Sequence, residues 1–427
     1  YSKDDIKYVS KNQNLKFNFK VYDKIIEVLY PNLVLGANTM FRGILDSDPS
    51  NFVLSFKSPE IRLNSSIAKR VEIKYDNSNK IFNSFFHIDS LSTSYFKAND
   101  LNIISSIIND TIHIKSKFNF GKIKDDKFDI NMFYINEKNK YVIGLKPSKL
   151  NFKTTEWKIN PDTASKLVYD NKEKTLNLDL TKMKQNMEEI AFNIASENSS
   201  SSNVNIEFKN VDFEKVTPEI KNLSLGGIIN GNLEISKIDD SYLPRSLLNI
   251  NNFSINDFNL GDFNADIFGN SSLTNYDVNI NIKDIDRKSF SAIGNFDVSG
   301  DNSYLDLNLS FNDLILNPLN SLGGNVISNI RGKISGKTKI TGRLEKPKID
   351  GLLMLDEGGM SIPYLNVDYE FDDKTMINLV DQSFIFQSAM FFDSKFKSSA
   401  KLDGKISHNN FTNWFLDTNI STDRLLV

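Results

Sequence analysis

Apolar and polar residues alternate strictly along short stretches of this chain, almost from end to end. Residues 204–209, 278–283 and 305–312 show the pattern most clearly, with Val, Ile, Leu or Phe at every second position. Successive side chains of a β-strand point to opposite faces of the sheet. Each stretch therefore predicts a strand with one apolar face and one polar face.

Further strands are predicted at intervals of about ten to fifteen residues, separated by turns rich in Asn, Asp, Gly and Ser. They cover residues 15–21, 52–56, 71–75, 112–120, 128–134, 176–180, 253–258, 396–402 and 414–420. Three segments depart from the alternation and predict short helices, each followed by a glycine-bearing strand: residues 21–30, 216–223 and 316–330. The pattern as a whole is typical of an all-β protein.

Composition excludes several classes of function. The chain has 427 residues, a formal net charge of −3 and no cysteine. The mixed charge lacks the basic footprint of a nucleic-acid-binding protein, so no nucleic-acid partner is expected. Without cysteine, the chain has neither disulfides nor thiolate metal sites. No apolar run is long enough for a transmembrane helix, and we interpret the chain as an internal part of a longer protein.

No residue pattern predicts catalysis. The histidines, His87, His113 and His408, stand apart from one another and from metal-ligand spacings. Gly226-Gly227 lacks the Lys-Ser or Lys-Thr of a phosphate-binding loop. Acidic clusters lack the spacing of a calcium loop, and the tryptophans are too dispersed for a sugar-stacking site. We therefore expect no enzyme, no cofactor and no metal site.

A long sheet with one apolar face must cover that face or use it. A second sheet can pack on it, the sheet can close on itself, or it can curl part of the way and leave a groove. About thirty strands at ~4.8 Å spacing would extend over roughly 140 Å, too far for an ordinary barrel. The predicted fold is an all-β, elongated, curled antiparallel sheet with a continuous hydrophobic groove and a few short helices.

From Gly226 onward the sequence resembles the TamB-like branch of the AsmA-like bridge proteins, in a form like that of Bacteroidetes. The resemblance rests on glycine-bearing strand entries and on the segments that follow them, whereas residues 1–210 share only the alternating texture. The segments that carry it are 225–233, 330–336, 341–352, 362–371 and 402–411, of which the one containing His408 and Phe411 is the most distinctive.

The resemblance implies a taco-shaped β-sheet that carries phospholipid between the inner and outer membranes across the periplasm. It also implies an inner-membrane anchor outside this chain and, as partner, an outer-membrane barrel of the Omp85 type, similar to TamA. Residues 1–215 would form the N-terminal portion of the groove and residues 216–427 the repeat-bearing portion, together making one continuous rod.

The candidate lipid-binding residues are the apolar members of alternating stretches in the second half of the chain. Acyl chains would lie against them, since each buried methylene contributes about 0.8 kcal/mol. They are Phe253, Ile255, Val278, Ile280, Leu305, Leu307, Leu309, Ile334, Val367, Tyr369, Leu402 and Leu416.

Two other interpretations fit the same pattern. In a surface adhesin or β-helix binding module, the apolar face would be a closed core that holds no lipid. In a scaffold for outer-membrane protein assembly, the contents of a groove would be incidental. Mass spectrometry of lipids that copurify with the protein separates the first of these from the groove.

Overall fold

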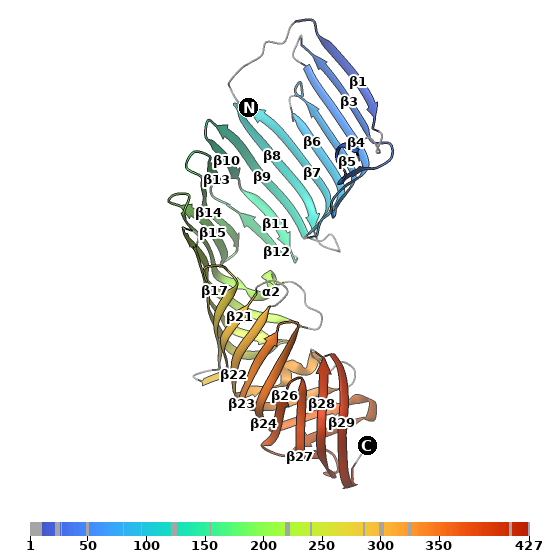
Figure 1. Ribbon diagram of the computed structural model, residues 1–427, viewed down its shortest axis with the longest axis vertical. Helices are drawn as coiled ribbons and strands as arrows, with labels where there is room; N and C mark the ends of the chain where they lie inside the picture. Colours follow the sequence, from blue (N-terminus) through green and yellow to red (C-terminus); the bar gives the residue numbers. More distant parts are fainter. Residues whose placement is uncertain are drawn as a thin grey trace. The chain divides into compact units, whose positions relative to one another are not determined.

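The computed structural model describes residues 11–425 apart from 22–25, 27, 48–50, 80, 95, 121–125, 154, 218–222, 240, 285–286, 299–302, 323–326 and 410–411. The described residues form 29 β-strands and a few short helical segments (Figure 1). All the described strand pairs are antiparallel, so the predicted curled, all-β antiparallel fold is confirmed. Within the described residues, no helix has both the length and the apolar sequence needed to cross a bilayer.

The chain divides into two compact units, Tyr1–Ser202 and Asn203–Val427. How the two units are arranged, including the single rod expected from the sequence, stays a prediction.

The first unit is one antiparallel sheet in which most strands pair with the strand before them in the sequence. At its centre the long strand β9 pairs with two short strands, β10 and β11, and β14 pairs with both β12 and β13. The strands are β1 (Asn14–Lys20), β2 (Leu33–Leu35), β3 (Met40–Asp46), β4 (Asn51–Leu63), β5 (Ser66–Asp76), β6 (Ser84–Ser92), β7 (Lys97–Ile108), β8 (Thr111–Phe120), β9 (Asp126–Glu137), β10 (Lys140–Leu145), β11 (Ser148–Phe152), β12 (Thr155–Ile159), β13 (Ser165–Asp170), β14 (Thr175–Gln185) and β15 (Glu188–Ser196).

The second unit repeats this construction with longer strands. From β17 to β24 each strand pairs with the next, and then β25 and β26 lie between β24 and β27. The strands are β16 (Ser201–Asp212, which begins just before the boundary), β17 (Leu225–Ile238), β18 (Ser241–Ile255), β19 (Phe258–Gly269), β20 (Asn275–Asp284), β21 (Arg287–Asp297), β22 (Tyr304–Ile315), β23 (Ser328–Arg343), β24 (Lys346–Ile362), β25 (Val367–Phe371), β26 (Thr375–Val380), β27 (Ser383–Asp393), β28 (Ser399–Asn409) and β29 (Thr412–Arg424).

The predicted helices are shorter than expected or displaced. The described helices are α2 (Phe213–Val216) and two 3-10 segments, η2 (Asn317–Leu322) and η3 (Pro363–Leu365). Half of the first prediction, 21–30, lies outside the described residues, although Ile26, Val28 and Leu29 are helical. Most of the second, 216–223, is also outside them. The third ends early because β23 begins at Ser328 and extends the sheet.

Two predicted strands are wrong in detail. Residues 253–258 are not one strand: 253–255 end β18, Phe258 begins β19, and Asn256 and Asp257 form the hairpin turn between them with positive φ angles of 50° and 68°, as tight two-residue hairpin turns require. Residues 396–398 belong to a loop and not to a strand, because the Asp393 carboxylate accepts hydrogen bonds from backbone N–H groups of that loop, including those of Phe396 and Ser398. Strand β28 therefore begins only at Ser399.

Candidate functional site

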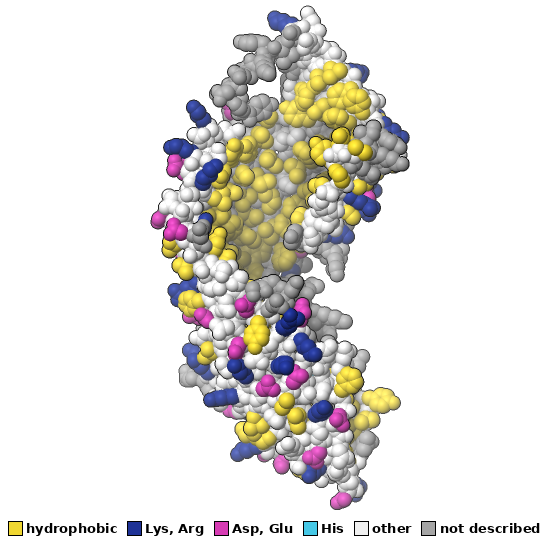
Figure 2. All heavy atoms as spheres, viewed as in Figure 1, with side chains coloured by type: hydrophobic (Ala, Val, Ile, Leu, Met, Phe, Trp, Pro, Cys, Tyr) yellow, Lys and Arg dark blue, Asp and Glu magenta, His cyan; other side chains and the backbone are white. Residues whose placement is uncertain are grey.

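The inner side of the first unit is a concave surface lined with hydrophobic side chains (Figure 2). Strand register shows how it is built, because residues directly opposite each other on paired strands project to the same face. One row of such partners crosses eight strands, from β1 to β9: Phe19, Phe41, Phe56, Ile73, Phe86, Ile103, Ser116 and Ile130.

A second row of partners crosses the rest of the sheet, from β7 to β15. It consists of Ile107, Ile112, Tyr134, Ile143, Leu167, Leu178 and Ile194. We call the surface formed by these two rows and the residues of the same parity on the same strands the concave face.

Most side chains of the concave face are only half-buried. Phe86, Ile103 and Ile130 are intermediate in exposure, and Ile107 and Ile143 are 43% and 44% exposed. A closed core would bury such residues almost completely. The concave face of the first unit is therefore open among the described residues, and its exposed apolar area is of the kind that marks a binding surface.

The opposite face of the same strands carries a polar row. The row runs through Lys57, Glu72, His87, Asn102, Lys117, Asp129 and Lys149, which are direct partners on successive strands. Opposite charges meet along it, with Nζ to carboxylate distances of 3.0 Å for Lys57 and Glu72 and 3.0 Å for Lys117 and Asp129. Hydrogen bonds from Lys74 and Lys57 hold the pKa of Glu72 below its ordinary value.

The second unit continues the same alternation but closes part of its apolar face. One row of direct partners crosses β18 to β28: Ile250, Phe263, Ile282, Phe290, Phe311, Gly336, Leu353, Ile377, Phe386 and Gly404. Towards its end the side chains of β25, β27 and β28 form a buried cluster, which we call the closed cluster: Val367, Tyr369, Phe386, Ala389, Phe391, Ala400 and Leu402.

The twelve residues predicted from the sequence lie on this face of the second unit, in different surroundings. Val278, Ile280, Leu305, Leu307, Leu309, Ile334 and Ile255 are partly buried on the strands that lead to the closed cluster. Phe253 is 8% exposed, with its ring centroid 5.3 Å from that of Phe263.

The remaining four residues of that set lie at the end of the second unit. Val367, Tyr369 and Leu402 are inside the closed cluster, where other side chains cover them. Leu416 is 72% exposed on β29, whose described pairing partner is β28 alone. Whether lipid contacts any of the twelve stays a prediction.

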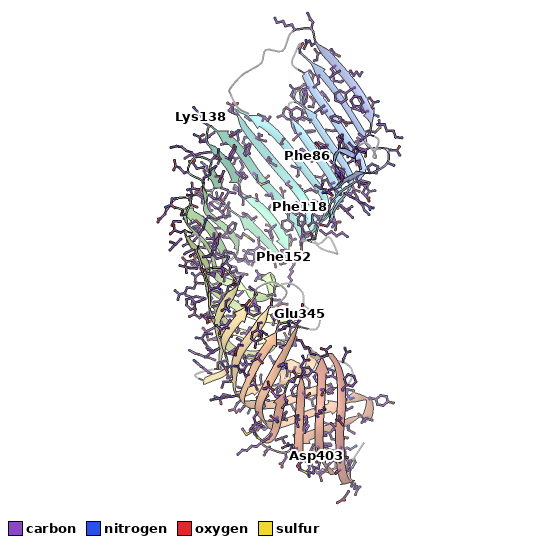
Figure 3. The ribbon with its side chains drawn as sticks, in the orientation of Figure 1. Phe86, Phe118, Lys138, Phe152, Glu345 and Asp403 are labelled. Carbon is purple, nitrogen blue, oxygen red and sulfur yellow. The ribbon has the colours of Figure 1, made fainter. Side chains whose placement is uncertain are left out.

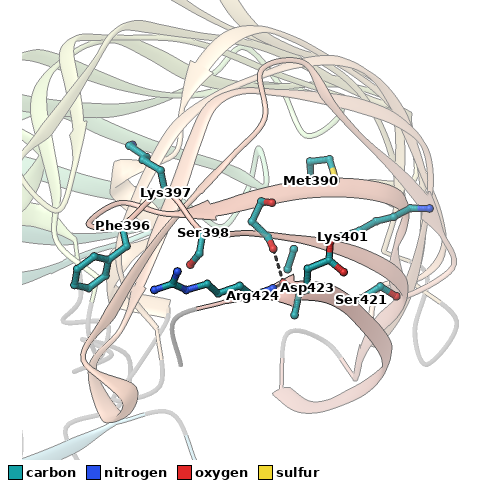
Figure 4. A pocket seen from close by; sticks show the side chains of 11 residues that line it. Met390, Phe396, Lys397, Ser398, Lys401, Ser421, Asp423 and Arg424 are labelled. Carbon is teal, nitrogen blue, oxygen red and sulfur yellow. Dashed lines mark hydrogen bonds between the residues drawn. The ribbon is translucent and has the colours of Figure 1, made fainter.

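A pocket of about 800 Å³ lies beside β28 and β29 (Figure 4). Its lining is mainly polar, and two of its cations are already engaged: Lys397 donates to Glu370 at 2.8 Å, and Lys401 lies 3.7 Å from Asp403. This cavity is a weaker candidate for an amphipathic ligand than the concave face.

Residues 135–355 match the family model described as TamB, N-terminal domain, which is just over half of the chain. The chain belongs to the TamB family. Its general role is therefore that of TamB proteins, bridge-like lipid transfer or outer-membrane biogenesis in the cell envelope. No curated protein and no solved structure matches the chain.

The TamB match begins at residue 135, whereas the resemblance seen in the sequence begins near Gly226. The match includes residues 135–210, for which only the alternating texture had been recognised, and it ends before the segment 402–411 that had seemed most distinctive. Residues 1–215 were predicted to form part of the groove, but none of the candidate lipid-binding residues was taken from the first unit. The alternation of residues 112–120 and 128–134 was the available signal, because these strands supply Phe118, Phe128 and Ile130 to that face.

Proposed function

We propose that this chain carries phospholipids between the inner and outer membranes, with acyl chains lying on the concave face of the first unit. The observation that supports this is the row from Phe56 to Ile130, in which every side chain except the buried Ser116 is apolar and half-exposed. The row from Phe56 to Ile130 crosses six strands, so at ~4.8 Å per strand it extends over roughly 24 Å. Partial burial of an acyl chain on such a surface is worth several kcal/mol.

The proposed transfer involves no bond making or breaking, so the chain would not act as an enzyme. Lipids would move along the row because each strand offers a similar apolar surface. The contact free energy lost when an acyl chain leaves one strand would be regained when it reaches the next. The inner-membrane anchor and a TamA-like barrel in the outer membrane complete the proposed path. They follow from the family and not from contacts within this chain.

Two neighbouring residues of β7 allow a matched test. Ile103 lies on the concave face opposite Phe86, whereas Ile104 projects to the other face and is 37% exposed. We expect Ile103→Arg to reduce lipid that copurifies with the protein, measured by phosphorus analysis and mass spectrometry. Ile104→Arg should leave it unchanged, because the same charge then points away from the bound chains.

The result also separates this function from a closed binding module. Purified protein that folds normally but holds no lipid would contradict the proposal and favour a closed core. An equal loss of lipid in both variants would show that the arginine acts through stability and not through the concave face.

A further inference from the structure

Among the described strands of the first unit, tyrosine occurs at one rim of the concave face and not at the other. The tyrosines in the described strands of the first unit, Tyr75, Tyr134, Tyr141 and Tyr169, all lie on this face and near the same ends of their strands. Tyr141 and Tyr169 are direct partners, with stacked rings whose centroids are 6.3 Å apart. We call this edge, together with the described turn residues 77–79, 81–83, 109–110, 138–139 and 171–174, the tyrosine rim.

The other ends of these strands carry aromatic residues without a hydroxyl group. Phe118 and Phe128 stack with ring centroids 4.7 Å apart, and Phe128 is followed across the sheet by Leu150 and Trp157. Figure 3 shows Lys138 at one edge of the sheet and Phe118 and Phe152 towards the opposite edge. We call this second edge the phenylalanine rim.

Tyrosine and phenylalanine prefer different depths at a boundary between lipid and water. Tyrosine places its ring in apolar surroundings and its hydroxyl in polar ones, and it is enriched at the headgroup level of membranes. Phenylalanine has no polar group to keep wet. The tyrosine rim is therefore suited to the boundary between acyl chain and headgroup, and the phenylalanine rim to acyl chains.

Lysines at the tyrosine rim add a complementary charge for a phosphate group. Lys138 is exposed and forms no ion pair within the described part of the chain. Lys140 lies next to Tyr141 and only 3.5 Å from Asp170, and Lys174 donates to Asn171 at 3.0 Å. A headgroup that carries a phosphate would find an unpaired cation at Lys138 and hydroxyl donors close by.

The width of the concave face fits one lipid lying across the strands. Phe128 and Tyr134 are six residues apart on β9, on the same face. At roughly 3.4 Å per residue they are about 20 Å apart. The acyl chains of one leaflet need about 15 Å, half of a ~30 Å hydrocarbon core.

We propose that the concave face fixes the orientation of its lipids, with phosphate headgroups along the tyrosine rim and acyl ends towards the phenylalanine rim. This rests on the proposed function and adds a headgroup subsite at Tyr134, Tyr141, Tyr169 and Lys138. Lipids so oriented would all present their headgroups at one edge of the sheet.

The chain lacks cysteine, so single reporters can be introduced without removing native thiols. A small fluorophore is attached at Tyr141→Cys on one rim or at Phe152→Cys on the other. Each protein is loaded with phosphatidylcholine brominated either near the glycerol or near the methyl end, because bromine quenches only at short range. Trp157 serves as a native reporter at the phenylalanine rim in a Trp414→Phe background.

Bromine near the glycerol should quench the Tyr141→Cys reporter about two-fold more than bromine near the methyl end, with the opposite order at Phe152→Cys and at Trp157. Equal or reversed quenching with lipid bound would overturn the orientation alone. Absence of bound lipid phosphorus from every preparation, including the unmodified chain, would overturn the proposed function as well.

A second set of variants tests the hydroxyl groups directly. Tyr134→Phe, Tyr141→Phe and Tyr169→Phe combined keep the rings and remove only the hydroxyls. We expect the contrast between the two brominated lipids at Trp157 to fall by about half. The matched control is Tyr276→Phe with Tyr304→Phe in the second unit, which should leave it unchanged. An unaltered contrast in the triple variant would show that the tyrosines do not orient the lipid.

Discussion

The guanidinium group of Arg331 on β23 donates to both carboxylate oxygens of Asp368 on β25, at 3.1 and 2.5 Å, across the intervening strand β24. The crossing is possible because Gly359 of β24 has no side chain. A Cβ atom there would lie 2.5 Å from the guanidinium carbon of Arg331. Ser394 also donates to Asp368, at 2.6 Å, so one carboxylate connects several strands on the face opposite to the closed cluster.

Removing the charge of Asp368 should loosen this end of the second unit. Asp368→Asn leaves Arg331 without its charge partner, and we expect a loss of about 1–2 kcal/mol, since both side chains keep partial contact with water. Thermal unfolding followed by circular dichroism measures the effect. Arg331→Lys, which keeps the charge but not the paired donors, should cost less, and the absence of any cost would contradict the role of the two-pronged contact.

Acid should act through the same carboxylate. Burial raises the pKa of Asp368, but hydrogen bonds from Arg331, Ser361 and Ser394 outweigh that effect and hold the pKa well below its ordinary value. Its contribution to stability is therefore complete above about pH 4, the ordinary range of an aspartate, and is lost as the pH falls further. The melting temperature should drop less steeply below pH 4 in Asp368→Asn than in the unmodified protein.

The open and closed parts of the apolar face should respond differently to truncation. Phe391 is 5% exposed in the closed cluster, and Phe391→Ala should cost about 3–4 kcal/mol because it leaves a cavity. Phe118 is only half-buried, and Phe118→Ala should cost about 1 kcal/mol in lipid-free protein. Urea titration of the two variants measures both. Equal costs would mean that the concave face is closed in solution.

Gly336 in β23 requires its missing side chain for a different reason. Its φ angle is 147°, and a Cβ atom would lie 2.2 Å from the carbonyl oxygen of Leu352 on the paired strand. We expect Gly336→Ala to destabilise the second unit by about 1–3 kcal/mol. Gly226→Ala is the control, since the near atom there is the movable Oγ of Ser254. If Gly226→Ala destabilised the second unit as much as Gly336→Ala, the cause would be the loss of glycine's backbone flexibility and not the contact with Leu352.

The polar row of the first unit should depend on salt. Glu72 lies between Lys57 and Lys74, with Nζ distances of 3.0 and 2.7 Å. Glu72→Lys places three positive charges together and should cost about 1 kcal/mol at low ionic strength. The cost should shrink in about 0.5 M salt because the charges are screened. Glu72→Gln should show little salt dependence.

The sequence was sufficient to predict the faces of the strands but not their exposure. Leu402 and Phe118 both belong to alternating stretches, yet Leu402 is 9% exposed and Phe118 is half-buried. The difference depends on whether side chains of other strands cover each one, and that is a property of the curl of the sheet. Leu416 follows the same alternation and is largely exposed because its strand, β29, has a described partner on one side only.

The position of a turn within an alternating stretch was also not predictable from residue type. Asn256 and Asp257 interrupt an apolar stretch that otherwise has strand-like composition, and their positive φ angles turn the chain back at that point. Asn and Asp tolerate this conformation but also occur within strands, as Asn264 does on β19. Residue type alone could not decide between the two.

Pairing between consecutive strands affects the order in which such a protein can fold and how its length can change. Within each unit, most strands need only the strand before them, so hairpins can form in order as the chain emerges, without waiting for distant segments. An inserted hairpin would lengthen the sheet by roughly 10 Å and leave the register of its neighbours unchanged. A protein built this way can be matched to the distance it has to cover by adding or losing hairpins.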